Sequence, residues 1–243
     1  MGSLLLIRHG QASADAVVYD KLSPLGEAQA RLLGAHWASR GDKVDRVYCG
    51  PRERQRRSAE IAIEAFRAGG GKVAAPELLE ELDEMRIEPL LQDQLRAICE
   101  KHPLLRDLAQ EMLSADTDET RTRARRKLGS TVLRLWNQGI VAAPGVETWL
   151  EFRARVRRAL DTLLRGAPKG AQLFAFTSAG VIGAAAQLAL DLGHTHALEL
   201  ALQMRNAASS RFLFSSGLEP RFSMASFNEL PHLADEPHLV TAL

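Results

Sequence analysis

Short apolar runs alternate with helix-patterned stretches in the first part of the chain. Residues 4–7 are all apolar and predict a short buried strand. Ser23 and Pro24 predict a helix start, because proline suits the first helical position, and apolar residues follow at helical spacing. Residues 44–49 predict a second strand and residues 52–68 a second helix. This alternation predicts an α/β fold whose mainly parallel sheet is flanked by helices.

The middle of the chain carries helix-type patterning only. Residues 89–135 contain no convincing strand, and Pro103 predicts a break between two helices. A further helix is predicted over residues 147–164. We therefore expect one domain over residues 1–243, with a helical cap of about residues 86–145 inserted into the α/β core.

Strand patterns return in the last third of the chain. Residues 173–177 predict a strand, and residues 180–190 predict the helix that follows it. Residues 209–215 and 222–227 predict two more strands, joined by a turn at residues 217–220. These two strands are expected to form an antiparallel edge of the sheet.

Composition narrows the classes of protein and partner. The chain has 31 Lys+Arg and 30 Asp+Glu residues, and this balance argues against a dedicated nucleic-acid-binding protein. No apolar run approaches the roughly 20 residues that a membrane helix needs, and residues 4–7 are too few for a secretory signal. Cys49 and Cys99 are too few for a disulfide scaffold or a structural zinc site. These features predict a cytoplasmic globular protein.

The end of the first predicted strand carries the first candidate chemistry. Arg8, His9 and Gly10 follow that strand directly, and ligands bind at the carboxyl ends of strands in open α/β sheets. Arginine offers a charged donor fork that suits phosphate, and histidine can act as a nucleophile. Glycine lets the backbone approach a ligand closely. By itself, however, the tripeptide fits an ordinary loop.

Two other loops supply matching chemistry. Arg54 lies just after the second predicted strand, at the start of a helix whose N-terminus attracts anions. Glu81 follows the third strand candidate and could protonate a leaving group. Gln11 and Ser13 come just after His9, and either substrate binding or loop hydrogen bonding would explain them. Together these residues indicate a site for a phosphorylated substrate.

At this point the sequence resembles the histidine phosphatase superfamily, also called the phosphoglycerate mutase-like family. The resemblance spans nearly the whole chain, and its middle is the least specific part. The segments that carry the resemblance are Leu6-Ile7-Arg8-His9-Gly10-Gln11, Leu22-Ser23-Pro24-Leu25-Gly26-Glu27-Ala28-Gln29-Ala30, Pro51-Arg52-Glu53-Arg54 with Ser58-Ala59-Glu60, Leu79-Glu80-Glu81, Glu147-Thr148-Trp149 with Phe152 and Arg155, and Phe227-Asn228-Glu229-Leu230-Pro231-His232-Leu233.

The resemblance implies a mechanism through a phosphohistidine. It implies that His9 is the nucleophile, that Arg8 and Arg54 hold the phosphoryl oxygens, and that Glu81 is the acid that protonates the leaving oxygen. Its neighbours Glu80 and Glu84 are less favoured by the motif. No metal and no other cofactor is implied. The expected partner is a phosphorylated small molecule, and a homodimer stays open.

One segment departs from the family pattern. The family's second histidine follows a late strand in a Ser/Thr-His-Gly-Gly pattern, whereas this chain reads Thr177-Ser178-Ala179-Gly180. We expect Ser178 and Ala179, with Gly10, to line the substrate site. Losing one hydrogen-bond donor of this kind typically costs ~10²–10³ in rate. The sequence also resembles a branch of the superfamily that carries serine at this position.

Three functions follow from the resemblance to the family and from the serine that replaces the family's second histidine. The first is an acid-type phosphomonoesterase that works through phosphohistidine at His9. The second is a phosphoglycerate mutase-type phosphotransferase, although the Trp-Asn pair of the mutases does not follow residues 8–13. The third is a phosphate-ligand-binding or partner-binding protein with little catalysis, which Ser178 motivates.

Overall fold

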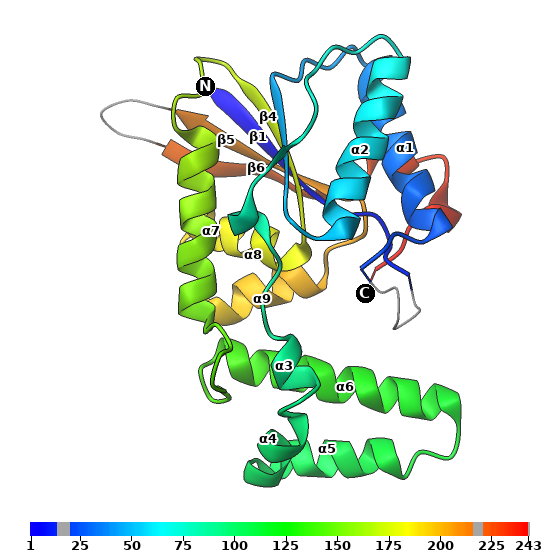
Figure 1. Cartoon of the computed structure of the whole chain (residues 1–243), viewed down its shortest axis with the longest axis vertical. Helices are drawn as coiled ribbons and strands as arrows, with labels where there is room; N and C mark the ends of the chain where they lie inside the picture. Colours follow the sequence, from blue (N-terminus) through cyan, green and yellow to red (C-terminus); the bar gives the residue numbers. More distant parts are fainter. Residues whose placement is uncertain (14–19, 216–220, 243) are drawn as a thin grey trace. The chain divides into compact units, whose positions relative to one another are not determined.

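A single six-stranded sheet forms the centre of the larger of two compact units. The computed structural model describes residues 1–13, 20–215 and 221–242. The strand order is β3-β2-β4-β1-β5-β6 (Figure 1). The strands are β1 (Gly2–Arg8), β2 (Arg46–Cys49), β3 (Glu77–Leu78), β4 (Gln172–Thr177), β5 (Ser209–Ser215) and β6 (Arg221–Glu229).

The direction of the strands follows the pattern predicted from the sequence. β1, β2, β3 and β4 pair in parallel, whereas β5 pairs antiparallel with both β1 and β6. The mainly parallel sheet and its antiparallel edge are therefore confirmed. The predicted turn at residues 217–220 lies outside the described residues.

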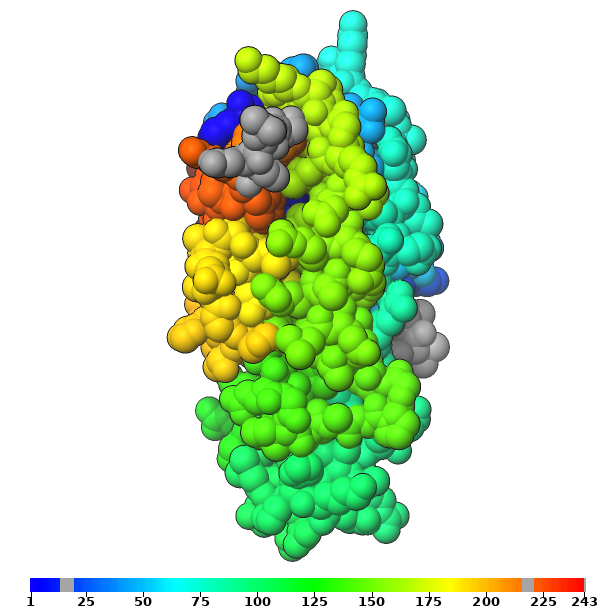
Figure 2. All heavy atoms as spheres, turned by 90° about the vertical axis from the view of Figure 1, so that its left-hand side faces the viewer, coloured from blue at the N-terminus to red at the C-terminus, as the bar shows by residue number. Residues whose placement is uncertain are grey.

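Helices cover both faces of this sheet. Figure 1 shows α1 and α2 together on one face and α8 and α9 on the other, and Figure 2 shows the outer side of α7 on the surface. The helices of the unit are α1 (Pro24–Ser39), α2 (Glu53–Ala68), the second half of α7 (Trp149–Leu164), α8 (Ala179–Leu190) and α9 (His194–Leu202), with short 3₁₀ turns η1 (Glu80–Leu82), η2 (Pro231–Leu233) and η3 (Pro237–Leu239). The sequence did not predict α9, which begins just after Gly193. No helix of the described ranges is long and apolar enough to cross a membrane.

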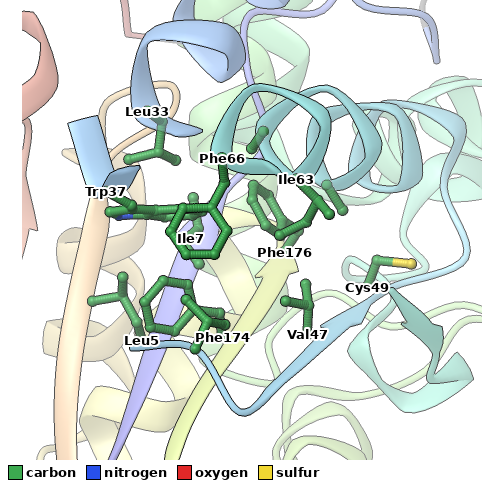
Figure 3. Close-up of a cluster of buried hydrophobic side chains, with 13 residues drawn as sticks. Leu5, Ile7, Leu33, Trp37, Val47, Cys49, Ile63, Phe66, Phe174 and Phe176 are labelled. Atoms are coloured by element: carbon green, nitrogen blue, oxygen red, sulfur yellow. The ribbon is translucent and has the colours of Figure 1, made fainter. Parts of the chain in front are cut away.

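The sheet face under α1 and α2 holds a continuous apolar core. Strand residues with side chains on this face pack against Leu33 and Trp37 of α1 and Phe66 of α2 (Figure 3). Trp37 meets Phe174 edge to face, with ring centroids 4.6 Å apart. Because alternate strand residues point to opposite faces, the neighbouring apolar residues of β1 are free to pack beneath α8. This two-sided burial explains why β1 reads as an uninterrupted apolar run.

The second compact unit comprises Met85–Ala154 and is all helical. Its helices are α3 (Glu88–Leu91), α4 (Leu95–Lys101), α5 (Pro103–Leu113), α6 (Asp118–Asn137) and the start of α7. The predicted break at Pro103 is confirmed, because α5 begins at that proline. Trp136 packs edge to face on Trp149, and its indole Nε1 donates to the Glu147 carbonyl at 2.8 Å. The cap expected over residues 86–145 falls inside this unit.

The close packing of α1 on α2 gives a stability prediction. A Cβ added at Gly34 of α1 would lie 1.9 Å from the Ala62 carbonyl oxygen of α2. Gly34→Ala should therefore lower the free energy of unfolding by about 1–3 kcal/mol, because the two helices must separate. Urea denaturation measures the change.

A matched glycine provides the control. A Cβ at Gly129 of α6 would meet nothing within 4 Å. Gly129→Ala should leave the free energy of unfolding unchanged or raise it by roughly 0.5–1 kcal/mol, as alanine does in a helix interior. Equal effects of the two substitutions would contradict the packing argument.

Candidate active site

The carboxyl ends of the parallel strands bring four loops together. The backbone N–H of His9 donates to the Thr177 carbonyl at 2.9 Å, which joins the end of β1 to the end of β4. The N–H of Gly50 donates to the Phe176 carbonyl at 3.0 Å, which joins the end of β2 to β4. Leu79 N–H donates to the Cys49 carbonyl at 2.9 Å and adds the segment after β3. The register of the sheet thus places residues far apart in sequence side by side.

His9 is buried and is held in one tautomer. Its Nδ1 lies 2.7 Å from the Gly10 carbonyl oxygen, which can only accept, so Nδ1 carries the proton. Its Nε2 accepts a hydrogen bond from Nε of Arg54 at 3.1 Å. Burial, followed by the charges of Arg8 and Arg54, holds the pKa of His9 well below its usual range. His9 is therefore a neutral imidazole with its lone pair on Nε2.

Two buried arginines flank this imidazole. Arg8 is 3% exposed and Arg54 is 5% exposed. The Arg8 guanidinium donates to the Met204 carbonyl. Nη1 of Arg54 donates to a carboxylate oxygen of Asp20 at 2.8 Å, and the other oxygen of Asp20 accepts the Glu53 N–H at 2.9 Å. A carboxylate thus lies at the N-terminus of α2, where an anion is favoured.

The loop after His9 is fixed between α1 and α2. The Gly10 N–H donates to Oγ of Ser58 at 3.0 Å, and Ser58 donates in turn to the Arg54 carbonyl at 2.7 Å. A Cβ at Gly10 would lie 2.3 Å from the Gly26 carbonyl oxygen, so only glycine fits this approach. The sequence analysis did not single out Ser58 by itself, because its role depends on this contact with Gly10.

Gln11 and Ser13 are held by loop hydrogen bonds. The Gln11 side chain accepts from Oγ of Ser23 at 2.8 Å, and its N–H donates to Gln29 at 2.9 Å. The Ser13 N–H donates to the Lys21 carbonyl at 2.7 Å. These contacts tie the loop to the start of α1, and substrate binding by Gln11 and Ser13 stays a prediction.

The segment that carries the candidate acids is held by its backbone. The buried guanidinium of Arg155 donates to the carbonyls of Glu81, Asp83 and Glu84 at 3.0, 2.7 and 3.0 Å. Nε of Arg52 also forms an ion pair with Asp83 at 2.6 Å. This bonding fixes the course of residues 81–84 and therefore the positions of their side chains.

The two glutamates of this segment differ in their surroundings. Oε2 of Glu84 lies 3.5 Å from the Gly180 N–H, a long hydrogen bond at the N-terminus of α8. The backbone carbonyl of Glu81 accepts a hydrogen bond from the Arg155 guanidinium at 3.0 Å. The structure thus places Glu84 at the strand-end cluster by a direct contact, whereas Glu81 stays the candidate that the motif favours.

Ser178 and Ala179 lie at the start of α8 and are buried. Ser178 is completely buried, and its Oγ accepts a hydrogen bond from Nε2 of Gln55 at 2.7 Å. Ala179 is 5% exposed. Sequence reasoning did not single out Gln55, because its partner lies far away in sequence. Substrate contact by Ser178 and Ala179 stays a prediction.

The charge of the site suits an anion. Its positive groups are Arg8, Arg54 and the N-terminus of α2, and a phosphoryl group carries the complementary charge. The Asp20 carboxylate already binds Arg54 and the N-terminus of α2, so a phosphoryl group would share these two groups with it. Within residues 1–13, 20–215 and 221–242, no group of three or more His, Cys, Asp and Glu side chains could hold a metal ion.

The lowered pKa of His9 gives a prediction about stability and pH. An unfolded histidine binds a proton below its ordinary pKa of about 6.5, whereas folded His9 resists protonation. The contribution of His9 to the free energy of unfolding is therefore present above pH ~6.5 and is lost as the pH falls below that value. In His9→Gln, the free energy of unfolding should fall less steeply with falling pH, by up to about 1.4 kcal/mol per pH unit. Urea denaturation between pH 7.5 and 5.5 measures this slope. A variant whose stability falls as steeply as that of the wild type would contradict a neutral His9.

Known proteins share this fold and this sequence pattern. No curated protein sequence matches the chain. Three solved structures superpose on nearly all of it. They are YhfR from Bacillus stearothermophilus (16% identity, 96% of this chain and 100% of that chain, TM-score 0.64), a mycobacterial glucosyl-3-phosphoglycerate phosphatase in complex with inorganic phosphate (20%, 96% and 100%, 0.60) and mycobacterial hydrolase 1 (18%, 95% and 100%, 0.60).

The 16–20% identities to these solved structures show only that the fold is shared. The family is shown by a match to its sequence pattern. The sequence pattern of the histidine phosphatase superfamily (branch 1) matches residues 4–119 and 110–223. These ranges include Arg8, His9, Arg54 and the segment that carries the candidate acids. The chain therefore belongs to the histidine phosphatase superfamily (branch 1).

Proposed function

We propose that this protein hydrolyses phosphomonoesters of small molecules through a phosphohistidine at His9. The observation that carries the proposal is the neutral, buried imidazole whose Nε2 lone pair lies beside Arg54. A histidine nucleophile must be unprotonated at the attacking nitrogen. Hydrolysis of a phosphomonoester is also supported by phosphatases of the same fold, which include the mycobacterial glucosyl-3-phosphoglycerate phosphatase.

The proposed reaction has two steps. In the first, the hydrogen bond from Nε of Arg54 to Nε2 of His9 breaks, and the freed Nε2 lone pair attacks phosphorus. The bond from phosphorus to the leaving oxygen breaks, and that oxygen takes a proton from a carboxylic acid. In the second, the resulting carboxylate takes a proton from water, whose oxygen attacks phosphorus and breaks the phosphorus–nitrogen bond. The products are an alcohol and inorganic phosphate, and His9 is regenerated. Arg8 and Arg54 stabilise the charge on the phosphoryl oxygens in both steps.

The acid belongs to residues 81–84. The family motif favours Glu81, whereas the contact with the N-terminus of α8 favours Glu84. This contact places the Glu84 carboxyl group beside the end of β4, at the edge of the sheet where His9 lies. On this geometry we propose Glu84 as the acid and keep Glu81 as the alternative.

A His9 substitution tests the proposed function. His9→Ala should abolish hydrolysis of para-nitrophenyl phosphate, because no other group replaces the nucleophile. Trapping of a phosphorylated protein from a ³²P-labelled substrate should be lost in the same variant. The control is His196→Ala, since His196 is exposed on α9. Unchanged turnover in His9→Ala would refute the mechanism.

The acid is tested with two leaving groups. Glu84→Gln should lower kcat by about 10²–10⁴ for an alkyl phosphate, whose leaving oxygen needs a proton, and by much less for para-nitrophenyl phosphate. Glu81→Gln is the matched variant in the same segment and should affect both substrates little. The opposite result would assign the acid to Glu81, as the motif predicts.

Because Ser178 replaces the family's second histidine, a second candidate function is phosphate binding without catalysis. A protein that binds phosphate and does not turn it over would use the same arginines. It would bind inorganic phosphate, and neither the wild type nor His9→Ala would hydrolyse a phosphomonoester. The mutase alternative is tested separately, with 3-phosphoglycerate and a bisphosphoglycerate primer.

A further inference from the structure

Gln55 and Ser178 form a completely buried polar pair next to the candidate active site. Both residues are 0% exposed, and Nε2 of Gln55 donates to Oγ of Ser178 at 2.7 Å. The same nitrogen donates to the Leu82 carbonyl at 3.3 Å, and Oε1 accepts the Arg52 N–H at 3.1 Å. Both polar atoms of the carboxamide are therefore engaged.

This one side chain connects three of the loops that build the site. Gln55 itself follows Arg54 in the first turn of α2. Leu82 belongs to the segment of the candidate acids, and Ser178 precedes α8. The carboxamide thus bridges the loops after β2, β3 and β4, and its hydrogen bonds to Leu82 and Ser178 are buried.

The surrounding backbone leaves room for this side chain and little else. A Cβ at Gly50 would lie 2.2 Å from Oε1 of Gln55 and 2.7 Å from the Leu82 carbonyl oxygen. Thr177 Oγ1 also donates to the Leu82 carbonyl, at 2.7 Å. Because Oγ of Ser178 lies only 2.7 Å from Nε2 of Gln55, a longer side chain that points the same way from position 178 would collide with this carboxamide.

We infer that Gln55 is a positioning residue, whose carboxamide fixes the acid segment relative to Arg54. Together with Ser178, this carboxamide fills the place of the imidazole that the family normally has at position 178. The inference rests on the proposed phosphatase function. Both side chains are 0% exposed, so on this inference the pair acts through the residues that it holds, in place of the substrate contact predicted for Ser178 from the sequence. A misplacement of about 1 Å of such groups can cost roughly 10²-fold in rate.

Gln55→Met tests the inference by keeping the volume and removing every hydrogen bond of the side chain. The kcat for an alkyl phosphate should fall by about 10–100-fold, with KM changed less than threefold, because groups needed in the transition state are misplaced. The matched control is Gln187→Met, another buried glutamine near the C-terminal end of α8, whose Nε2 donates to the Leu192 carbonyl at 3.0 Å. Gln187→Met should lower Tm and leave kcat unchanged.

A purely structural role for Gln55 would give a different result. Both variants would then lose Tm by similar amounts, and the kcat of folded Gln55→Met would stay within twofold of the wild type. That outcome would overturn the inference.

Binding of two anions separates this inference from the proposed function. Orthovanadate adopts the five-coordinate geometry of phosphoryl transfer, whereas inorganic phosphate resembles the ground state. Gln55→Met should bind vanadate at least tenfold more weakly and phosphate within threefold of the wild type. If the wild type showed no turnover, the proposed phosphatase function would be refuted. The affinities for vanadate and phosphate would still decide whether Gln55 positions the site.

A pair of substitutions tests which space the carboxamide occupies. Ser178→His alone should lower both Tm and kcat, because the imidazole collides with Gln55. Adding Gln55→Ala should recover at least tenfold in kcat over Ser178→His, because it removes the carboxamide. If Ser178→His alone matches or exceeds the wild type, or if the folded double variant recovers nothing, Gln55 and Ser178 do not replace the imidazole together.

Discussion

Two buried guanidinium groups beside one imidazole constrain the rest of this site. Removing a charge from water costs several kcal/mol unless the charge is paired or solvated by the protein. Arg54 meets this requirement through Asp20, and Arg8 donates to the Met204 carbonyl. Burial, followed by the same two charges, lowers the pKa of His9 and so favours its neutral form. One arrangement therefore brings two cations and a ring nitrogen with a lone pair to the same place.

The parallel sheet makes this arrangement attainable for residues far apart in sequence. Strand β4 lies between β1 and β2, so the loops after these strands meet at one edge. Close contacts then fix the loops, since only glycine fits at position 10 against Gly26. The Arg155 guanidinium fixes the backbone of the acid segment in a similar way. Buried side chains thus hold the loops of the site by hydrogen bonds to their backbone groups.

Sequence reasoning succeeded where the information is local. Apolar runs and helix starts predicted β1, β4, α1 and α2 within a few residues, and the ends of these elements pointed to Arg8, His9 and Arg54. It missed α9, and it could not find Asp20 or Gln55. Their partners lie 34 residues away in the case of Arg54 and 123 residues away in the case of Ser178, and no spacing rule connects such positions. Contacts of this kind depend on strand order, which appears only in the folded chain.

A departure from a motif is therefore better understood together with the residues around it. Ser178 by itself suggests the loss of a hydrogen-bond donor and a weakened site. In the fold, a carboxamide whose nitrogen and oxygen both form hydrogen bonds lies against it, and the Ser178 hydroxyl accepts one of these bonds. Under the proposed mechanism the phosphoryl oxygens then rely on two fixed cations, and hydrogen bonds from cations are about twice as strong as neutral ones. Both arginines are buried, so their attraction to the phosphoryl oxygens is stronger than it would be in a solvated site.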